Sequence, residues 1–165
     1  MAGSFSMPRK LTLTNNEGIY QLTQRPIVAD NIPTEEIILN AHDAITSNVA
    51  TTSSNTYRLK LTINLLDSKG FALNLLQNDN EKSILSYDVA TETLSFDRTQ
   101  SGQVGFHPRF KSVETMTVKP QNKQLKLDII VDKSVVEIFA NNGRKVLTDL
   151  VFPTKTNGKV LMIWQ

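Results

Sequence analysis

The side chains with the clearest chemical potential in this sequence stand where a predicted strand ends. Asp97 and Arg98 are consecutive there, and Ser101 and Gly102, three and four residues after Arg98, are typical of a turn. A guanidinium offers five donors in a planar fork, which suits a carboxylate or a pair of sugar hydroxyls. The pattern therefore indicates either an ion pair or a polyol-binding site at this turn.

Glu137 is the natural candidate partner for this guanidinium. It lies in mid-strand with Val135 and Phe139 as same-face neighbours, so we expect its carboxylate in a partly apolar surface, where it needs a partner. In one hypothesis, Arg98 and Glu137 form an ion pair that pins a loop to the sheet. In the other, Asp97, Arg98 and Glu137 face a sugar in a shallow site, to which Ser101 also belongs.

His107 is a further candidate for sugar binding. It lies between Phe106 and Phe110, in a loop with aromatic side chains that either borders a ligand or covers one end of the core. The pair His42 and Asp43 does not make a metal site, because further ligands at suitable spacing are missing. The sequence therefore predicts no metal and no cofactor.

The elements that position these residues read as strands. Between Leu125 and Val131, apolar residues alternate with other residues, the period of a strand with one face in a core. A second strand, 135–140, stops at Asn141-Asn142-Gly143, which favours the positive φ angles of a tight hairpin turn. A third strand, 144–152, ends at Pro153, which has no N–H for a ladder.

The rest of the chain shows the same short strands between turns. Strands are predicted at 11–13, 19–23 up to Pro26, 35–39, 57–66, 71–75, 84–89 and 93–97. The strands 57–66 and 71–75 are expected to form a hairpin. The polar segment 43–54 indicates a loop or an irregular strand edge, and we interpret it as a loop within one domain. This pattern predicts an all-β fold, a sandwich of two antiparallel sheets in a jelly-roll arrangement. We expect one domain, 1–165, with 1–6 as a flexible entry.

Composition excludes several classes of protein. A hydrophobic content of 39% and a charged content of 21% are ordinary for a globular domain. The 18 basic residues are scattered among 16 acidic ones and form no basic stripe. We therefore expect neither nucleic acid nor an anionic membrane as a partner. The absence of cysteine excludes disulfides and thiolate metal sites but does not fix the compartment.

Three segments together resemble a known family. The runs SMPRKLTL (6–13), LSFDRTQSG (94–102) and VDKSVVEIFANNGRKVLTDLVFP (131–153) are similar, in order and separation, to the C-terminal domain of glycoside hydrolase family 32. Members of this family are β-fructosidases: invertases, levanases, inulinases and sucrose-6-phosphate hydrolases. The resemblance spans nearly the whole chain and implies two antiparallel sheets packed face to face.

The resemblance also implies where catalysis takes place. A glycosidase needs two carboxylates at a fixed separation, and in the family these belong to an N-terminal five-bladed propeller, within Asn-Asp-Pro, Arg-Asp-Pro and Glu-Cys motifs. This chain contains none of the three motifs. We therefore expect no catalytic residue in it and no enzymatic activity of the chain alone.

Two functions remain open. The chain is either an accessory domain that packs on the propeller and stabilises it, or a module that recognises the terminal fructose of a fructan. The first predicts an exposed apolar patch that includes the segment 7–13, and a homodimer is a further expected assembly. The second predicts a polar pocket lined by Asp97, Arg98 or Glu137. The family implies a bacterial parent enzyme outside the cell or at its surface, or alternatively in the cytoplasm.

Overall fold

The chain forms strands throughout the residues that its computed structural model describes, which are 5–16, 18–41 and 45–165. No helix that could cross a membrane occurs in these ranges. The strands are β1 (Arg9–Asn16), β2 (Ile19–Pro26), β3 (Thr34–Asn40), β4 (Thr46–Thr52), β5 (Thr56–Asn64), β6 (Gly70–Gln77), β7 (Ser83–Asp88), β8 (Thr93–Asp97), β9 (Val113–Thr117), β10 (Gln124–Asp132), β11 (Val135–Ala140), β12 (Lys145–Leu150) and β13 (Gly158–Trp164).

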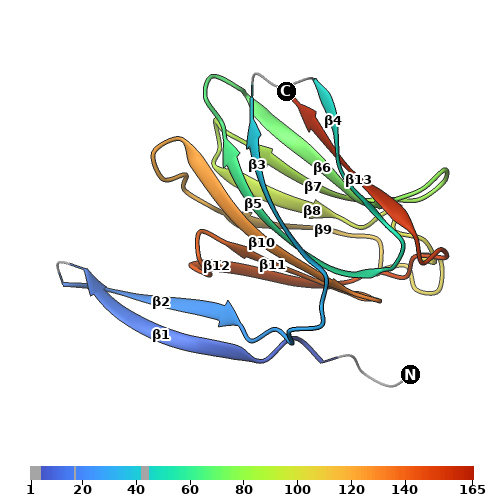
Figure 1. The fold of residues 1–165 in the computed structure, drawn as a ribbon, viewed down its shortest axis with the longest axis horizontal. Helices are drawn as coiled ribbons and strands as arrows, with labels where there is room; N and C mark the ends of the chain where they lie inside the picture. The colour runs from blue at the N-terminus through green and yellow to red at the C-terminus, as the bar shows by residue number, and fades with distance from the viewer. Residues whose placement is uncertain (1–4, 17, 42–44) are drawn as a thin grey trace.

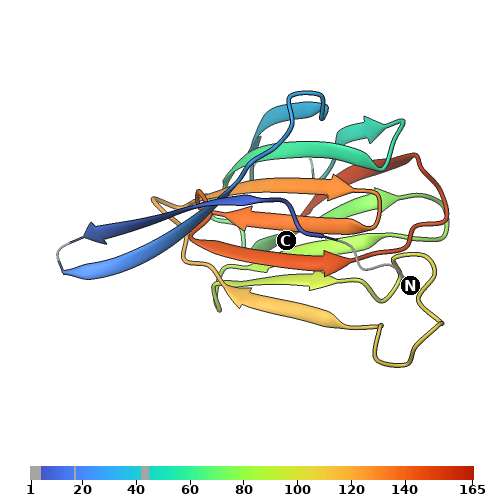
Figure 2. The ribbon, with the colours of Figure 1, turned by 90° about the horizontal axis from the view of Figure 1, so that it is seen from below.

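Two sheets packed face to face form the body of the molecule (Figure 1, Figure 2). One has five strands in the order β12-β11-β10-β5-β3, and the other has six in the order β4-β13-β6-β7-β8-β9. The expected all-β sandwich is confirmed. The pairing of β3 with β5 is parallel, so the five-stranded sheet is mixed rather than purely antiparallel.

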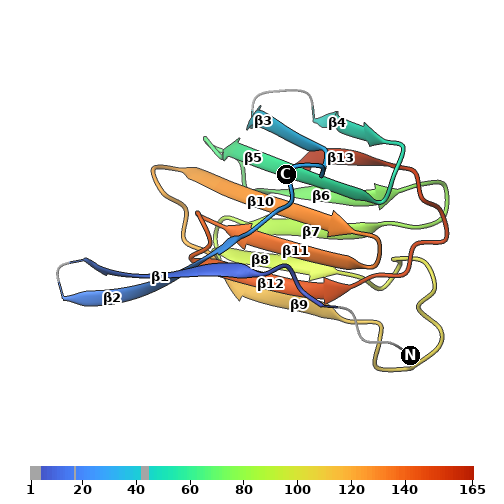
Figure 3. The same cartoon turned by 60° about the horizontal axis from the view of Figure 1, so that its bottom comes forward.

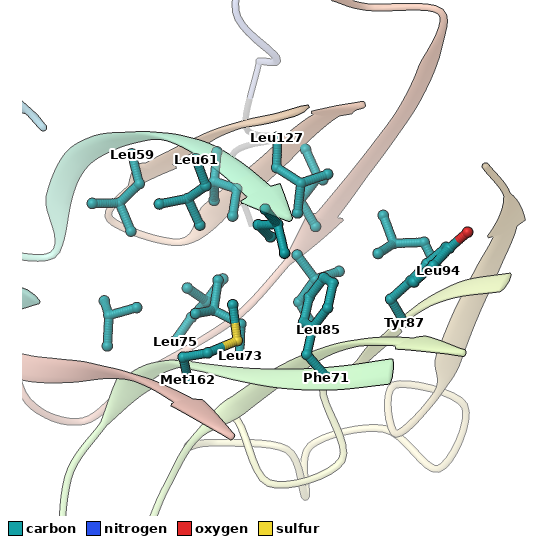
Figure 4. Close-up of a cluster of buried hydrophobic side chains, with 14 of the residues drawn as sticks. Leu59, Leu61, Phe71, Leu73, Leu75, Leu85, Tyr87, Leu94, Leu127 and Met162 are labelled. Carbon is teal, nitrogen blue, oxygen red and sulfur yellow. The ribbon is translucent and has the colours of Figure 1, made fainter. Parts of the chain in front are cut away.

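The core lies between the sheets and is built from alternate residues of each strand. The expected inward face of β5, from Tyr57 to Leu65, is buried at every second position, and so is that of β10 from Leu125 to Val131. Figure 4 shows Leu59, Leu61 and Leu127 above Phe71, Leu73, Leu75 and Met162 of the opposite sheet. Each fully buried side chain of this kind contributes about 1.5–3 kcal/mol to stability.

The hairpin expected between 57–66 and 71–75 is wrong. β5 pairs with β10 and β3, whereas β6 pairs with β7 and β13 in the other sheet. The segment between them, which contains Leu66 at a φ of 47°, crosses from one sheet to the other. The alternation of residues is the same for two strands in one sheet and for two strands in facing sheets, so it does not distinguish these pairings.

The polar loop expected at 43–54 is also wrong for its described part. Residues 46–52 form β4, an edge strand that pairs with β13 and buries Ala50. An edge strand has one neighbour and much solvent-facing surface, so polar residues are tolerated along it. His42 and Asp43 lie outside the described residues.

β1 and β2 form a separate antiparallel hairpin, which we call the ribbon. The strands expected at 11–13 and 19–23 are confirmed within it. The base of the ribbon lies at the outer face of the five-stranded sheet, and the rest projects past the ends of the strands (Figure 1, Figure 3). The amide of Gln24 donates to the carbonyl of Gly143 at 2.9 Å and joins the ribbon to the turn between β11 and β12.

That turn has the backbone that its sequence predicts. Asn141, Asn142 and Gly143 have φ angles of 48°, 61° and 81°. A Cβ atom on Gly143 would lie 1.9 Å from the carbonyl oxygen of Gln24, so the approach of the ribbon requires glycine here.

Candidate functional site

Arg98 follows β8 directly and is held by β12. Its Nη1 contacts Oδ1 of Asp149, and its Nε donates to the Ser112 hydroxyl at 2.9 Å. The guanidinium also stacks on the Phe110 ring, 4.4 Å from its centroid. Burial raises the pKa of Asp149, and the charge of Glu114 acts in the same direction. The Arg98 fork therefore fastens the loop 98–112 to the sheet.

Glu137 is almost completely buried in mid-strand, and its partners come from the N-terminal segment. Arg9 Nη2 donates to Oε2 at 2.7 Å, the amide of Met7 donates to Oε1, and the Thr148 hydroxyl lies 3.4 Å from Oε2. The Arg9 guanidinium also lies 5.3 Å from the centroid of the Phe139 ring. The expectation that Glu137 needs a partner is confirmed, and this partner anchors the ribbon.

The expected ion pair between Arg98 and Glu137 is wrong. The register pairs Glu137 with Thr148 on the outer face of the sheet, whereas Asp149, one residue later, faces the interior. Successive strand residues point to opposite faces, so the two ion pairs lie on opposite sides of the five-stranded sheet. The structure does not bring Arg98 and Glu137 together in one site.

The other predicted residues are placed within the same loop. Asp97 accepts from the amide of Thr99 at 2.8 Å and shapes the turn. Ser101 is buried, and its hydroxyl has no hydrogen-bond partner among the described residues. His107 is exposed, and its Nδ1 accepts from the amide of Arg109 at 3.2 Å.

Aromatic residues make the loop 98–112 compact. Phe106 and Phe110 lie 4.6 Å apart, and both pack on Phe152 at 5.4 and 5.3 Å, measured between ring centroids. Gly102, with a φ of 104°, approaches Phe152 so closely that a Cβ atom would lie 2.2 Å from its carbonyl oxygen. Of the two interpretations of this loop, covering the end of the core fits these contacts.

Sequence reasoning missed a groove on the outer face of the five-stranded sheet. It has a volume of about 740 Å³, a floor of β5 and β10, and walls from β2, β3 and the turn at Asn142. Its charged lining residues are Arg25, Glu36, Arg58, Lys60, Lys126 and Asp128. We call it the outer-face groove.

Two ion pairs organise the outer-face groove. Arg58 forms a bidentate ion pair with Asp128, in which Nε donates to Oδ1 at 2.8 Å and Nη2 donates to Oδ2 at 2.7 Å. Lys60 Nζ donates to Oε1 of Glu36 at 2.6 Å. The bond to Lys60 lowers the pKa of Glu36, and the bond to Asp128 raises the pKa of Arg58. A signal for the groove was present in the sequence, since charged residues occupy the outward positions of β5 and β10.

The ribbon carries an apolar face of its own. The register places Leu11, Leu13, Tyr20 and Leu22 on one face, which is the face that carries Arg9. Their side chains are between 47% and 67% exposed. The opposite face is mostly polar, with Ile19 as its apolar exception at 73% exposed. Among the described residues, no group of three His, Cys, Asp or Glu could hold a metal ion.

Comparison with known proteins identifies the sandwich. The profile described as "Glycosyl hydrolases family 32 C terminal" matches residues 22–163. The chain belongs to this family. The match covers β3 to β13 almost completely, and so both sheets of the sandwich.

Curated relatives of this domain are larger proteins. The chain is 28% identical to a levanase of Bacillus sp. strain L7 over 92% of its own length, and 33% identical to a sucrose-6-phosphate hydrolase of Streptococcus mutans over 96%. It is 30% identical to an extracellular exo-inulinase of Aspergillus ficuum over 92%. The chain spans between 17% and 30% of the length of these relatives.

Solved structures agree with this assignment. The exo-inulinase of Aspergillus awamori superposes on 97% of the chain with a TM-score of 0.77 at 26% identity. The sucrose-6-phosphate hydrolase of Lactobacillus gasseri superposes on 94% with a TM-score of 0.66 at 27% identity. In both, the matched part is 32% of the solved chain, so the family 32 C-terminal domain is one part of a larger enzyme there.

Proposed function

We propose that this family 32 C-terminal domain is the non-catalytic accessory sandwich of a β-fructosidase, and that it packs on the catalytic five-bladed propeller through the ribbon. The observation that carries the proposal is the apolar face formed by Leu11, Leu13, Tyr20 and Leu22. Contiguous exposed apolar surface on a folded domain marks an interaction site. A partner domain that covers this face would remove it from water.

The construction of the ribbon supports docking. Its apolar residues alternate with Lys10, Thr12 and Thr23 on the other face, so one face is suited to burial and the other to solvent. Arg9 and Gln24 hold the base of the ribbon against Glu137 and Gly143. The outer part is thus presented in a fixed orientation, which lowers the entropic cost of association.

Catalysis is assigned to the propeller. The chain contains none of the three carboxylate motifs of the family's catalytic domain. Glu137 and Asp149 are engaged in ion pairs with Arg9 and Arg98, which hold the ribbon and the loop 98–112 to the sheet. Among the described residues, no pair of free carboxylates lines the outer-face groove, because Glu36 and Asp128 are both held by cations. We therefore expect no hydrolysis by this chain alone.

The relatives suggest the substrate class and the compartment. Levanase and extracellular exo-inulinase are among them, so we assign the parent enzyme to the hydrolysis of fructans outside the cell or at its surface. The alternative is a cytoplasmic sucrose-6-phosphate hydrolase, the activity named for the Streptococcus mutans relative. Activity of the parent enzyme on levan, inulin and sucrose 6-phosphate separates these assignments.

Fructose binding by Asp97, Arg98, Ser101, His107 and Glu137 stays a prediction, and so does a homodimer. Because Arg98 and Glu137 lie on opposite faces of one sheet, a single sugar would contact one of them and not both. His107 is the exposed member of the set within the loop 98–112.

Association with a propeller tests the proposed docking face. The catalytic domain of the Streptococcus mutans sucrose-6-phosphate hydrolase, produced without its C-terminal domain, is mixed with this chain and followed by sedimentation velocity. Leu13→Ser should weaken association by about tenfold, because one well-buried apolar anchor contributes about 1.4 kcal/mol or more.

Ile19→Ser is the matched control, since Ile19 is also an exposed apolar residue but lies on the other face of the ribbon. It should leave the complex unchanged. Equal effects of Leu13→Ser and Ile19→Ser would contradict docking through the proposed face.

A further inference from the structure

We propose that the outer-face groove binds a sugar that carries one anionic group, either a phosphate or a carboxylate. The groove is separate from the apolar face of the ribbon, and none of the residues first singled out as a sugar site lines it. Charge, hydrogen-bonding capacity and size each support this ligand.

Charge gives the groove its preference for an anion. Four cations line it, Arg25, Arg58, Lys60 and Lys126, against two carboxylates. Arg58 and Lys60 each hold one carboxylate. Arg25 and Lys126 make no ion pair with any described residue. Two cations are therefore left to bind one anionic group of a ligand.

The floor of the groove suits hydroxyl groups. The register places Glu36, Lys60 and Asp128 next to one another across β3, β5 and β10, on the outer face. Neighbouring strands are about 4.8 Å apart, so this row spans about 10 Å. It presents acceptors and donors in alternation, and each hydroxyl of a sugar is both a donor and an acceptor.

The dimensions of the groove favour a small molecule. A volume of about 740 Å³ lies within the range of roughly 300–1,000 Å³ that is typical of small-ligand sites. The ribbon at Arg25 and Pro26 forms one wall, and the turn at Asn142 and Gly143 continues it. An acidic protein segment is the competing occupant.

Calorimetric titration of the whole chain measures this binding. The probes are fructose 6-phosphate, glucuronate, fructose, inorganic phosphate and a hexa-aspartate peptide. One of the two anionic sugars should bind saturably, more weakly at high salt because charges are paired, and at least about tenfold more tightly than fructose or inorganic phosphate. Which of the two binds identifies the anionic group.

Lys126→Ala and Arg25→Ala should each lower the affinity by about tenfold. Lys159→Ala is the matched control, because Lys159 is an exposed lysine that alternates with the core residue Val160 and so faces outward from the other sheet. Backbone amide shifts on titration should be largest around Lys60, Lys126 and Asn142.

Three results of the titration would overturn the proposal. They are no saturable binding of either anionic sugar, equal binding of inorganic phosphate, and tighter binding of the hexa-aspartate peptide. The second would reveal an unspecific anion site, and the third would assign the groove to an acidic protein segment. An affinity that survives both Lys126→Ala and Arg25→Ala would also overturn it, since it would place the ligand elsewhere.

Discussion

At the scale of residues, two buried carboxylates, Glu137 and Asp149, are each paired with an arginine that is remote in sequence. A third, Glu81, instead accepts from Asn78 and Thr154. Arg9 reaches Glu137 across 128 positions, and Arg98 reaches Asp149 across 51. Burial of an unpaired charge costs several kcal/mol, so each pair is needed where it stands. The ionised form of Asp149 is disfavoured, because burial raises the pKa of this carboxyl and its Oδ2 has no hydrogen-bond partner among the described residues.

Asp149→Asn tests this assignment through the pH dependence of stability. The folded protein keeps the Asp149 proton to a higher pH than the unfolded chain, whose ordinary value is 3.8. The stabilisation from Asp149 is therefore fully present below about pH 3.8 and is lost as pH rises through the raised pKa. Urea unfolding at a series of pH values should show the wild type losing free energy of unfolding relative to Asp149→Asn across this window.

Asp67→Asn controls for the loss of one negative charge, since Asp67 is exposed on a turn. A wild type that gains stability relative to Asp149→Asn as pH rises would contradict the assignment. It would mean that attraction to Arg98 outweighs burial.

At the scale of elements, the ribbon depends on the turn between β11 and β12. Gly143→Ala should detach it, because the residue has a φ of 81° and its added Cβ would collide with the Gln24 carbonyl. We expect a loss of more than about 1 kcal/mol in the free energy of unfolding, with faster proteolysis within β1 and β2. Denaturant unfolding and limited proteolysis measure the two effects.

Gly105→Ala is the matched control, because nothing lies within 4 Å of its added Cβ. It should change stability by no more than about 0.5 kcal/mol. Equal losses for the two variants would show that the ribbon does not need the close approach at Gly143.

The strands were largely predictable from the sequence, and their pairing was not. Alternation in β5 and β10 shows which side of a strand is buried but not which sheet the strand joins, so β5 and β6 were wrongly paired. The polar sequence of β4 lacks the alternation of apolar residues that predicts a strand, because an edge strand tolerates polar residues. The partners of Arg98 and Glu137 were not predicted, because the two side chains contact opposite faces of the five-stranded sheet. Which face each one contacts depends on the register of β11 with β12, which the sequence does not show.

At the scale of the whole molecule, the domain has three distinct parts: the sandwich, the ribbon and the outer-face groove. The facing sheets supply a core that needs no partner, whereas the ribbon presents apolar side chains beyond the sandwich. The outer-face groove opens between the two. A domain with this division suits a larger enzyme whose stability depends on contact between its parts.

We propose that this domain stabilises a catalytic propeller by binding its folded state. Calorimetric melting of the Streptococcus mutans propeller, alone and with this chain in excess, tests it most directly. At a chain concentration of about 100 times the Kd, binding adds about 2.7 kcal/mol to the stability of the propeller. Its Tm should therefore rise by a few degrees and should rise further with chain concentration. A Tm that is the same with and without the chain would contradict the claim.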